Sequence, residues 1–219
     1  MLVQKSMQER LSVPEVFRSI CLASGIFAVL MILFSIAAYI PTHPDFSPFN
    51  TFLSDIGDTP GWPQIIFNSG TLIAAPLRYL VLILLVLRMY QLGAGINFGR
   101  TVLLIGALAT LGTILMTAVP FSVAPSVHKA GIPLYFLGVV PMQIIIGVRE
   151  LTLKDIPRSL PVISFLLAGS YLVFFILVIL YELGVVSRTT SITPMIWQWL
   201  GFSFSILWVF MHGLVLGKK

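Results

Sequence analysis

Six continuous apolar segments, each about 20 residues long, run through this 219-residue chain and limit what it can fold into. A helix needs roughly 20 predominantly apolar residues to cross the ~30 Å hydrocarbon core of a bilayer. The segments are residues 19–40, 65–87, 101–121, 130–148, 161–183 and 195–216. Membrane-spanning strands would show short stretches of alternating apolar and polar residues instead. We therefore predict an all-α integral membrane protein with six transmembrane helices in one bundle, a single domain covering residues 1–219.

The composition agrees with this fold and argues against other classes of protein. Hydrophobic residues make up 58% of the chain and charged residues 10%, whereas soluble domains carry roughly 25% charged residues. Cys21 is the only cysteine, so an intrachain disulfide and a cysteine-based zinc or iron–sulfur site are excluded. The net charge of +5 has a simpler explanation in membrane topology than in nucleic-acid binding, which we do not expect. We predict no cofactor.

Lysine and arginine residues lie mostly on one side of the predicted bundle. That side carries Lys5, Arg10, Arg18, Arg88, Arg100, Arg149, Lys154, Arg158, Lys218 and Lys219. The opposite side carries only Lys129 and Arg188. Because positively charged loops favour the cytoplasm, we predict a cell-membrane protein with both termini cytoplasmic.

Glycines are spaced along the third and fourth predicted helices. Gly106 and Gly112 lie on the third, and Gly131 and Gly138 lie on the fourth. Small residues let two transmembrane helices approach closely, so these positions favour tight packing of the pair. The short connection between the two helices, residues 122–129, predicts that they are antiparallel neighbours.

The longest loop, residues 41–64, lies on the predicted outer side and is rich in proline and acidic residues. Prolines argue against one regular helix, but the loop has too many apolar side chains for a solvated linker. We predict a short interfacial helix with Ser47 as N-cap and Pro48 at its first position. The side chains expected to face the bundle are Phe49, Phe52, Leu53 and Ile56.

Polar residues gather at the outer end of the predicted bundle. The set consists of Ser54, Asp55, Asp58, Asn68, His128 and Gln198. A carboxylate that orients an imidazole beside a hydroxyl is the arrangement that acyl transfer requires, which makes Ser54, Asp55, Asp58 and His128 candidate catalytic residues. Alternatively, the two aspartates cap turns through the backbone and His128 caps a helix at the interface.

The same side of the membrane holds nitrogen and oxygen groups that could bind a divalent ion. These are His43, Asp45, Asp55, Asp58 and His128. Zinc and calcium sites use such ligands, but no pair here has the spacing that marks a metal site. We therefore predict no bound metal and keep the five residues as weak candidates.

Arg78 lies inside the second apolar segment, about 20 Å from its outer end at ~1.5 Å per residue. An arginine at this depth is costly, so it normally faces the bundle interior and marks a pathway or a bound anion. Gln143 and His212 are expected in the same layer. With Asn68 and Gln198, these residues are candidates for binding a ligand or lipid. Alternatively, Arg78 extends toward the inner headgroups, or it satisfies a carbonyl that Pro76 leaves without a donor.

Two stretches and one tryptophan carry a family resemblance. The string NTFLSDIGDTPGWPQIIFNSG (50–70), the string AVPFSVAPSVHKAGIPLYFLG (118–138) and Trp208 resemble a prokaryotic six-span membrane family, domain of unknown function 998 (DUF998). That family usually carries an acid near the proline of the second string, and this chain has none there. The SDIGDTP string alone is similar to the eukaryotic family of damage-regulated autophagy modulators (Frag1/DRAM/Sfk1). The first resemblance implies the fold and no particular activity.

Three functions remain open from the sequence. The first is a non-enzymatic lipid-contacting or regulatory bundle that holds a lipid headgroup or a partner helix. The second is an intramembrane, hydrolase-like lipid-modifying enzyme that uses the outer acids and His128. The third is a small transporter, although no inverted repeat is evident. Because no strong catalytic motif is present, we favour the first, with membrane lipids as partners and a homo-oligomer or a membrane protein partner as further possibilities.

Overall fold

The computed structural model describes residues 12–118, 120–187 and 194–218, and within them six long helices are present. They are α2 (Val13–Tyr39), α4 (Trp62–Gln91), α5 (Ile96–Thr117), α6 (Pro125–Thr152), α7 (Ser159–Glu182) and α8 (Pro194–Leu216). Each is long and apolar enough to cross a membrane. The predicted all-α membrane fold with six spans is therefore confirmed for the described residues.

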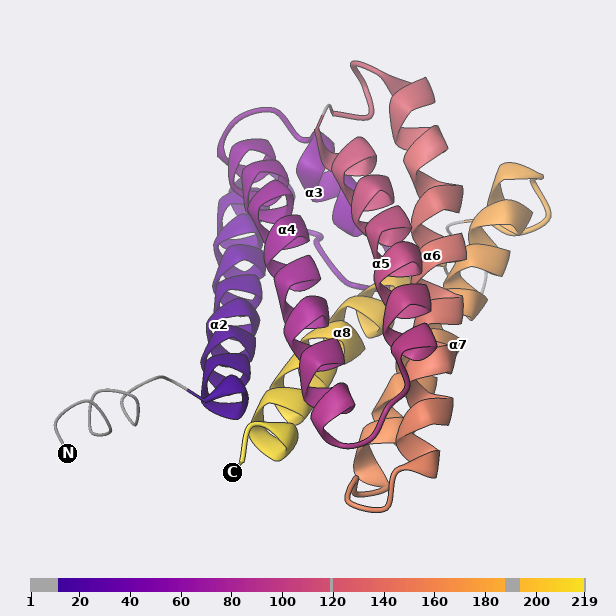
Figure 1. Cartoon of the computed structure of the whole chain (residues 1–219). Helices are drawn as coiled ribbons and strands as arrows, with labels where there is room; N and C mark the ends of the chain where they lie inside the picture. The colour runs from indigo at the N-terminus through magenta and orange to yellow at the C-terminus, as the bar shows by residue number, and fades with distance from the viewer. Residues whose placement is uncertain (1–11, 119, 188–193, 219) are drawn as a thin grey trace, which may run out of the picture.

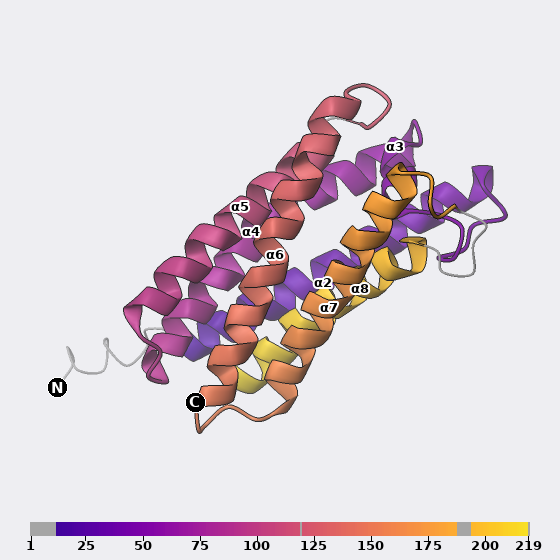
Figure 2. The ribbon, with the colours of Figure 1, turned by 90° about the vertical axis from the view of Figure 1, so that its right-hand side faces the viewer.

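The six helices form a ring in chain order. Each helix packs against the next long helix in the sequence, and α8 closes the ring by packing against α2. In Figure 1 the start of α2 and the end of α8 lie at the same end of the bundle, with α8 passing behind α4 and α5. We call this the termini end, and the opposite end, which carries the short helix α3 (Leu53–Asp58), the loop end. Figure 2 shows α4, α5 and α6 side by side along one wall of the ring.

Most helices extend beyond the apolar segments that predicted them. α2 begins at Val13, where Glu15 caps the helix by accepting from the Ser12 N–H at Oε2 over 3.1 Å. Such a cap pairs backbone donors that the first turn of a helix would otherwise leave unsatisfied. Polar residues at the membrane interface therefore continue the helices by about one turn, and a criterion based on apolar residues misses that turn.

The loop helix begins later than the sequence predicted. α3 covers Leu53–Asp58 with Phe52 as its N-cap, so the predicted start at Pro48 is wrong. Residues 48–50 form a single turn, which the Asn50 side chain closes by accepting from the Ser47 N–H and donating to the Asp45 carbonyl. These bonds end the turn before a helix can grow from it.

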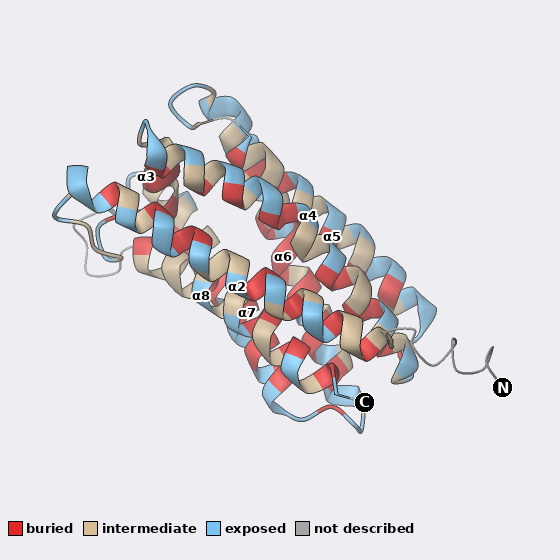
Figure 3. Cartoon of the chain, turned by 90° about the vertical axis from the view of Figure 1, so that its left-hand side faces the viewer, coloured by how far each residue is buried: buried red, intermediate tan, exposed pale blue. Residues whose placement is uncertain are grey.

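Figure 3 shows the buried residues mainly on the inward faces of the helices and the exposed residues mainly on their outer faces. On α3, Leu53 and Ile56 are buried as predicted. Phe49, expected to face the bundle, lies before α3 and is 64% exposed. Phe52 is half-buried, which is less than Leu53 and Ile56 and more than Phe49. α3 thus inserts its apolar face into the loop end of the ring.

Candidate functional site

A cavity of about 370 Å³ lies inside the loop end of the bundle, beneath α3. Five of the six long helices contribute to its wall, and α2 does not. Its polar and charged lining residues are Ser54, Asp55, Asp58, Asn68, Thr71, Arg78, Thr113, Thr117, His128, Lys129, Glu182 and Gln198, together with Tyr135, Tyr171 and Tyr181. The predicted outer residues and Arg78 therefore border one cavity, whereas Gln143 and His212 do not line it. Its size falls within the range of small-molecule sites.

Two amide side chains hold α3 over this cavity. Gln198 Oε1 on α8 accepts from the Leu53 N–H over 2.7 Å, and Asn68 Nδ2 on α4 donates to the Gly57 carbonyl over 2.8 Å. A Cβ at Gly57 would lie 2.6 Å from Asn68 Oδ1, so a larger residue here would displace the Asn68 side chain. The structure thus gives Asn68 and Gln198, predicted as ligand-binding residues, contacts that fasten α3, which forms the lid of the cavity.

The two candidate carboxylates of the lid also make structural hydrogen bonds. Asp55 Oδ2 accepts from the Phe52 N–H over 2.9 Å and caps α3. Asp58 Oδ1 accepts from the Ser122 N–H over 2.8 Å and from its hydroxyl over 2.6 Å, which ties α3 to the connection between α5 and α6. Ser54 borders the cavity beside them. These bonds match the turn-capping alternative for Asp55.

His128 faces the cavity from the first turns of α6. Its Nδ1 lies 2.8 Å from the Met116 carbonyl, which can only accept, so Nδ1 carries a proton and Nε2 is left for other partners. The charge of Asp58 acts on the ring, but no hydrogen bond joins the described carboxylates to it. In this arrangement no carboxylate orients His128 as a triad would require.

Two of the five weak metal candidates lie away from the cavity. The His43 ring stacks on Tyr39 with centroids 4.1 Å apart, and neither His43 nor Asp45 borders the cavity. Within the described residues, no three acidic, histidine or cysteine side chains come together in a way that could hold a metal ion.

The lid contact of Gln198 can be tested directly. Because Gln198→Leu removes the acceptor of the Leu53 N–H, we expect the α3 amides to exchange with solvent about tenfold faster. Hydrogen exchange followed by mass spectrometry on the detergent-purified protein measures this. Gln64→Leu, at the start of α4, is the control and should leave exchange in α3 unchanged. Equal exchange in the Gln198 variant and the native protein would contradict the role of this residue as a fastener.

Arg78 forms the floor of the cavity. It lies on α4, about 24 Å along the helix from the loop end, and is half-buried. Within the described residues its guanidinium makes no ion pair or hydrogen bond, although its charge acts on the hydroxyls of Tyr135 and Tyr171. A cation without a carboxylate partner is costly in a membrane interior. Arg78 is thus a charged group at the floor of the cavity whose cost is not offset by a described ion pair.

Two smaller cavities also border Arg78. The first, which we call the inner chamber, has about 90 Å³ and continues from the floor toward the termini end. It contains Gln143, as predicted for the Arg78 layer, and reaches Trp208. The second has about 30 Å³ and lies toward α2. Arg78 therefore lies at the junction of all three cavities.

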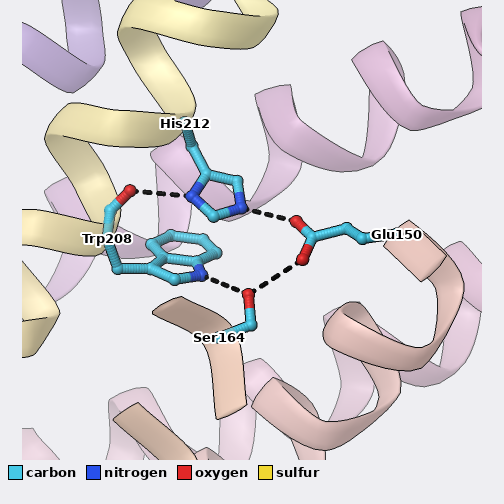
Figure 4. Close-up of polar contacts among 4 residues, drawn as sticks. All are labelled: Glu150, Ser164, Trp208 and His212. Carbon is cyan, nitrogen blue, oxygen red and sulfur yellow. Dashed lines mark hydrogen bonds and ion pairs between the residues drawn. The ribbon is translucent and has the colours of Figure 1, made fainter. Parts of the chain in front are cut away.

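His212 is not in the Arg78 layer, where the sequence placed it. It is fully buried below the inner chamber and pairs with Glu150 of α6, with Nε2 and Oε1 2.5 Å apart (Figure 4). Its Nδ1 lies 2.8 Å from the Trp208 carbonyl and must donate to it. One proton is therefore left for the carboxylate and the imidazole to share.

The Glu150–His212 pair belongs to a closed ring of hydrogen bonds. The Trp208 indole N–H donates to Ser164 Oγ over 2.9 Å, and the Ser164 hydroxyl donates to Glu150 Oε2 over 3.0 Å. Figure 4 shows the ring returning through His212 to the Trp208 backbone. Serine, histidine and glutamate also make hydrolytic triads, but here the serine bonds the carboxylate and not the histidine. We interpret the ring as a link between α6, α7 and α8.

Sequence patterns missed Glu150 because it follows Arg149 at the end of an apolar segment, which is typical of interfacial charge. Helical spacing contained a signal. Phe136, Val139, Gln143, Ile146 and Glu150 follow one another at intervals of three and four residues, and all are buried. Extending this spacing of buried positions by four residues beyond Ile146 would have predicted that Glu150 faces the inside of the bundle.

The comparison with known protein families agrees with this fold. Neither curated proteins nor solved structures give a match to the chain. The model of the Frag1/DRAM/Sfk1/Cwh43P N-terminal domain matches residues 16–217, which covers all six spans. This confirms the resemblance carried by the SDIGDTP string, whereas the resemblance to DUF998 is not shown. The SDIGDTP residues build the lid and its attachments, and Trp208 joins the inner chamber to the buried ring. The chain is therefore a multi-pass membrane protein of the Frag1/DRAM/Sfk1/Cwh43P N-terminal domain family.

Proposed function

We propose that this protein binds an anionic amphiphile, such as a lipid with a phosphate headgroup, in the cavity beneath α3. The observation that carries the proposal is Arg78, a guanidinium at membrane depth that faces a cavity and has no carboxylate partner in the described structure. Arginine binds phosphate and carboxylate through paired N–H donors. An anion at this point neutralises the buried charge and satisfies those donors.

The walls of the cavity support an amphiphilic ligand. Above the floor, apolar side chains from α4 to α8 separate Arg78 from the polar rim. They include Phe67, Met116, Ile132, Phe136, Phe174 and Phe202. At the rim, Lys129 and Glu182 form an ion pair of 2.8 Å between α6 and α7, with side chains 50% and 55% exposed. A surface pair of this kind adds little stability and costs little to open. The apolar wall between Arg78 and this rim suits the apolar part of a ligand, and the ion pair at the rim can open to admit it.

We further propose that the loop end faces away from the cytoplasm. The described cations at the ends of the helices lie mostly at the termini end, where the positive-inside rule places the cytoplasmic face. The cavity beneath α3 would then face the outer leaflet. In this orientation the protein would take its ligand from the outer leaflet or the outer solution.

The proposal predicts a specific loss of anionic ligand when Arg78 is neutralised. For Arg78→Gln we expect binding of dihexanoyl phosphatidylglycerol to weaken at least tenfold, because a charge-assisted hydrogen bond contributes about 1.5–3 kcal/mol. Native mass spectrometry of the detergent-purified protein measures the bound fraction over a titration. Zwitterionic dihexanoyl phosphatidylcholine serves as the comparison ligand.

Arg100→Gln is the matched control, because Arg100 is an exposed arginine at the start of α5 outside the cavity. It should leave lipid binding unchanged. The proposal fails if the native protein binds the two lipids equally, or if Arg78→Gln and Arg100→Gln have the same effect.

A further inference from the structure

We infer that the inner chamber binds the hydroxyl groups of a short polyol carried by the anion that Arg78 holds. The ligand class is then a phosphate ester of a glycerol-sized polyol, either as a lipid headgroup or as a free ester. This inference rests on the proposed binding of an anion at Arg78 and adds the chemistry of its substituent. Its evidence comes from a different cavity and from different polar groups.

Four hydroxyl groups in the chamber wall donate their protons to backbone carbonyls. Thr110 and Thr113 donate to carbonyls one turn back in α5, over 2.9 Å and 3.1 Å. Ser205 donates to the Phe202 carbonyl over 2.7 Å, and Tyr79 to the Leu103 carbonyl over 3.3 Å. Each of these oxygens keeps lone pairs that can still accept. These four oxygens are therefore available as acceptors.

Gln143 adds an acceptor that is both buried and unsatisfied. The residue is 3% exposed, lines the chamber, and its Oε1 has no hydrogen-bond partner among the described residues. A buried amide oxygen without a donor costs roughly 1–3 kcal/mol, so native structures rarely keep one without a reason. A donor that enters the chamber would remove this cost.

The charge and the volume of the inner chamber limit which hydrogen-bond donors can enter it. Arg78 is the only charged residue that lines the chamber within the described structure, so an ammonium group there would be repelled by its cation. A hydroxyl donates without charge and also accepts. The volume of about 90 Å³ accommodates a few water-sized groups, which fits a glycerol-sized substituent. A neutral polyol attached to the phosphate satisfies both limits.

The test compares two lipids that differ only in these hydroxyls. Dihexanoyl phosphatidylglycerol and dihexanoyl phosphatidylmethanol carry the same phosphodiester charge, and only the first has a polyol. By native mass spectrometry we expect the native protein to bind the glycerol lipid about tenfold more tightly. Gln143→Met, which is nearly isosteric, should bring the two affinities within about twofold of each other. Gln91→Leu, at the exposed end of α4, should keep the native preference.

Equal affinity of the native protein for the two lipids would overturn the inference, and the chamber would then hold water only. This result needs no variant, so it stands even if Gln143→Met does not fold. If both lipids still bind through Arg78, the proposed function survives that outcome, whereas absence of binding by either lipid overturns both. If free glycerol 3-phosphate competes with the glycerol lipid in the native protein but not in Gln143→Met, the result supports polyol binding in the inner chamber. The ligand is then a soluble phosphate ester. A failure to compete, with the lipid preference intact, would assign it to the membrane.

Discussion

Replacing Glu150 by leucine is expected to lower the free energy of unfolding by about 3–5 kcal/mol, because the change breaks a fully buried pair and leaves its partners unsatisfied. Glu150 is 1% exposed and its two carboxylate oxygens accept from Ser164 and pair with His212. Leucine fills much of the same space but provides no acceptor for the imidazole or the serine hydroxyl. Reversible unfolding in mixed micelles, followed by circular dichroism, measures the loss.

Glu150→Gln separates hydrogen bonding from charge. The glutamine oxygen can accept from Ser164, and its NH₂ group can donate to Nε2 of a neutral His212, so the ring remains closed. We expect this variant to lose no more than about 1 kcal/mol. A loss as large as that of Glu150→Leu would show instead that the pair depends on its charge.

The double variant Glu150→Leu with His212→Phe provides the second control. It removes both members of the pair, so only the Ser164 hydroxyl is left without its side-chain acceptor. We expect it to regain part of the stability lost in Glu150→Leu, with a coupling energy of roughly 1–3 kcal/mol. Strict additivity of the two single effects would contradict the pairing seen in Figure 4.

The number and order of the spans could be predicted because apolar length alone determines them. A helix is the only single segment that satisfies its own backbone in lipid, so an apolar segment of sufficient length specifies both the element and its position. The start of α3 could not be predicted in the same way. It depends on the Asn50 side chain closing an earlier turn and on Asp55 capping the next one, and the apolar pattern specifies neither contact.

The candidate site was predictable in part. Arg78 and Gln143 were expected in one layer because both lie at similar depth in apolar segments, and the structure has both at the inner chamber. The depth of a residue in the membrane does not determine toward which side of its helix the side chain points. His212 points away from that chamber toward Glu150. The sequence also could not show whether Asn68 and Gln198 face a ligand or the lid, since their partners are backbone groups of α3.

Gly112→Ala is expected to destabilise the bundle by about 1–3 kcal/mol and to alter the cavity as well. A Cβ at this position would lie 2.4 Å from the Tyr135 backbone nitrogen and 2.8 Å from the Gly131 carbonyl oxygen, so two backbones and not a flexible side chain must move. Tyr135 lines both the large cavity and the inner chamber, so separation of α5 and α6 should also weaken lipid binding.

Gly169→Ala in α7 is the matched control, because nothing lies within 4 Å of its added Cβ. There alanine should stabilise the helix by up to about 1 kcal/mol, since glycine is the poorer helix former. Thermal unfolding of the two variants should therefore shift in opposite directions, and a shift of the same sign would show that α5 and α6 are not held in such close contact.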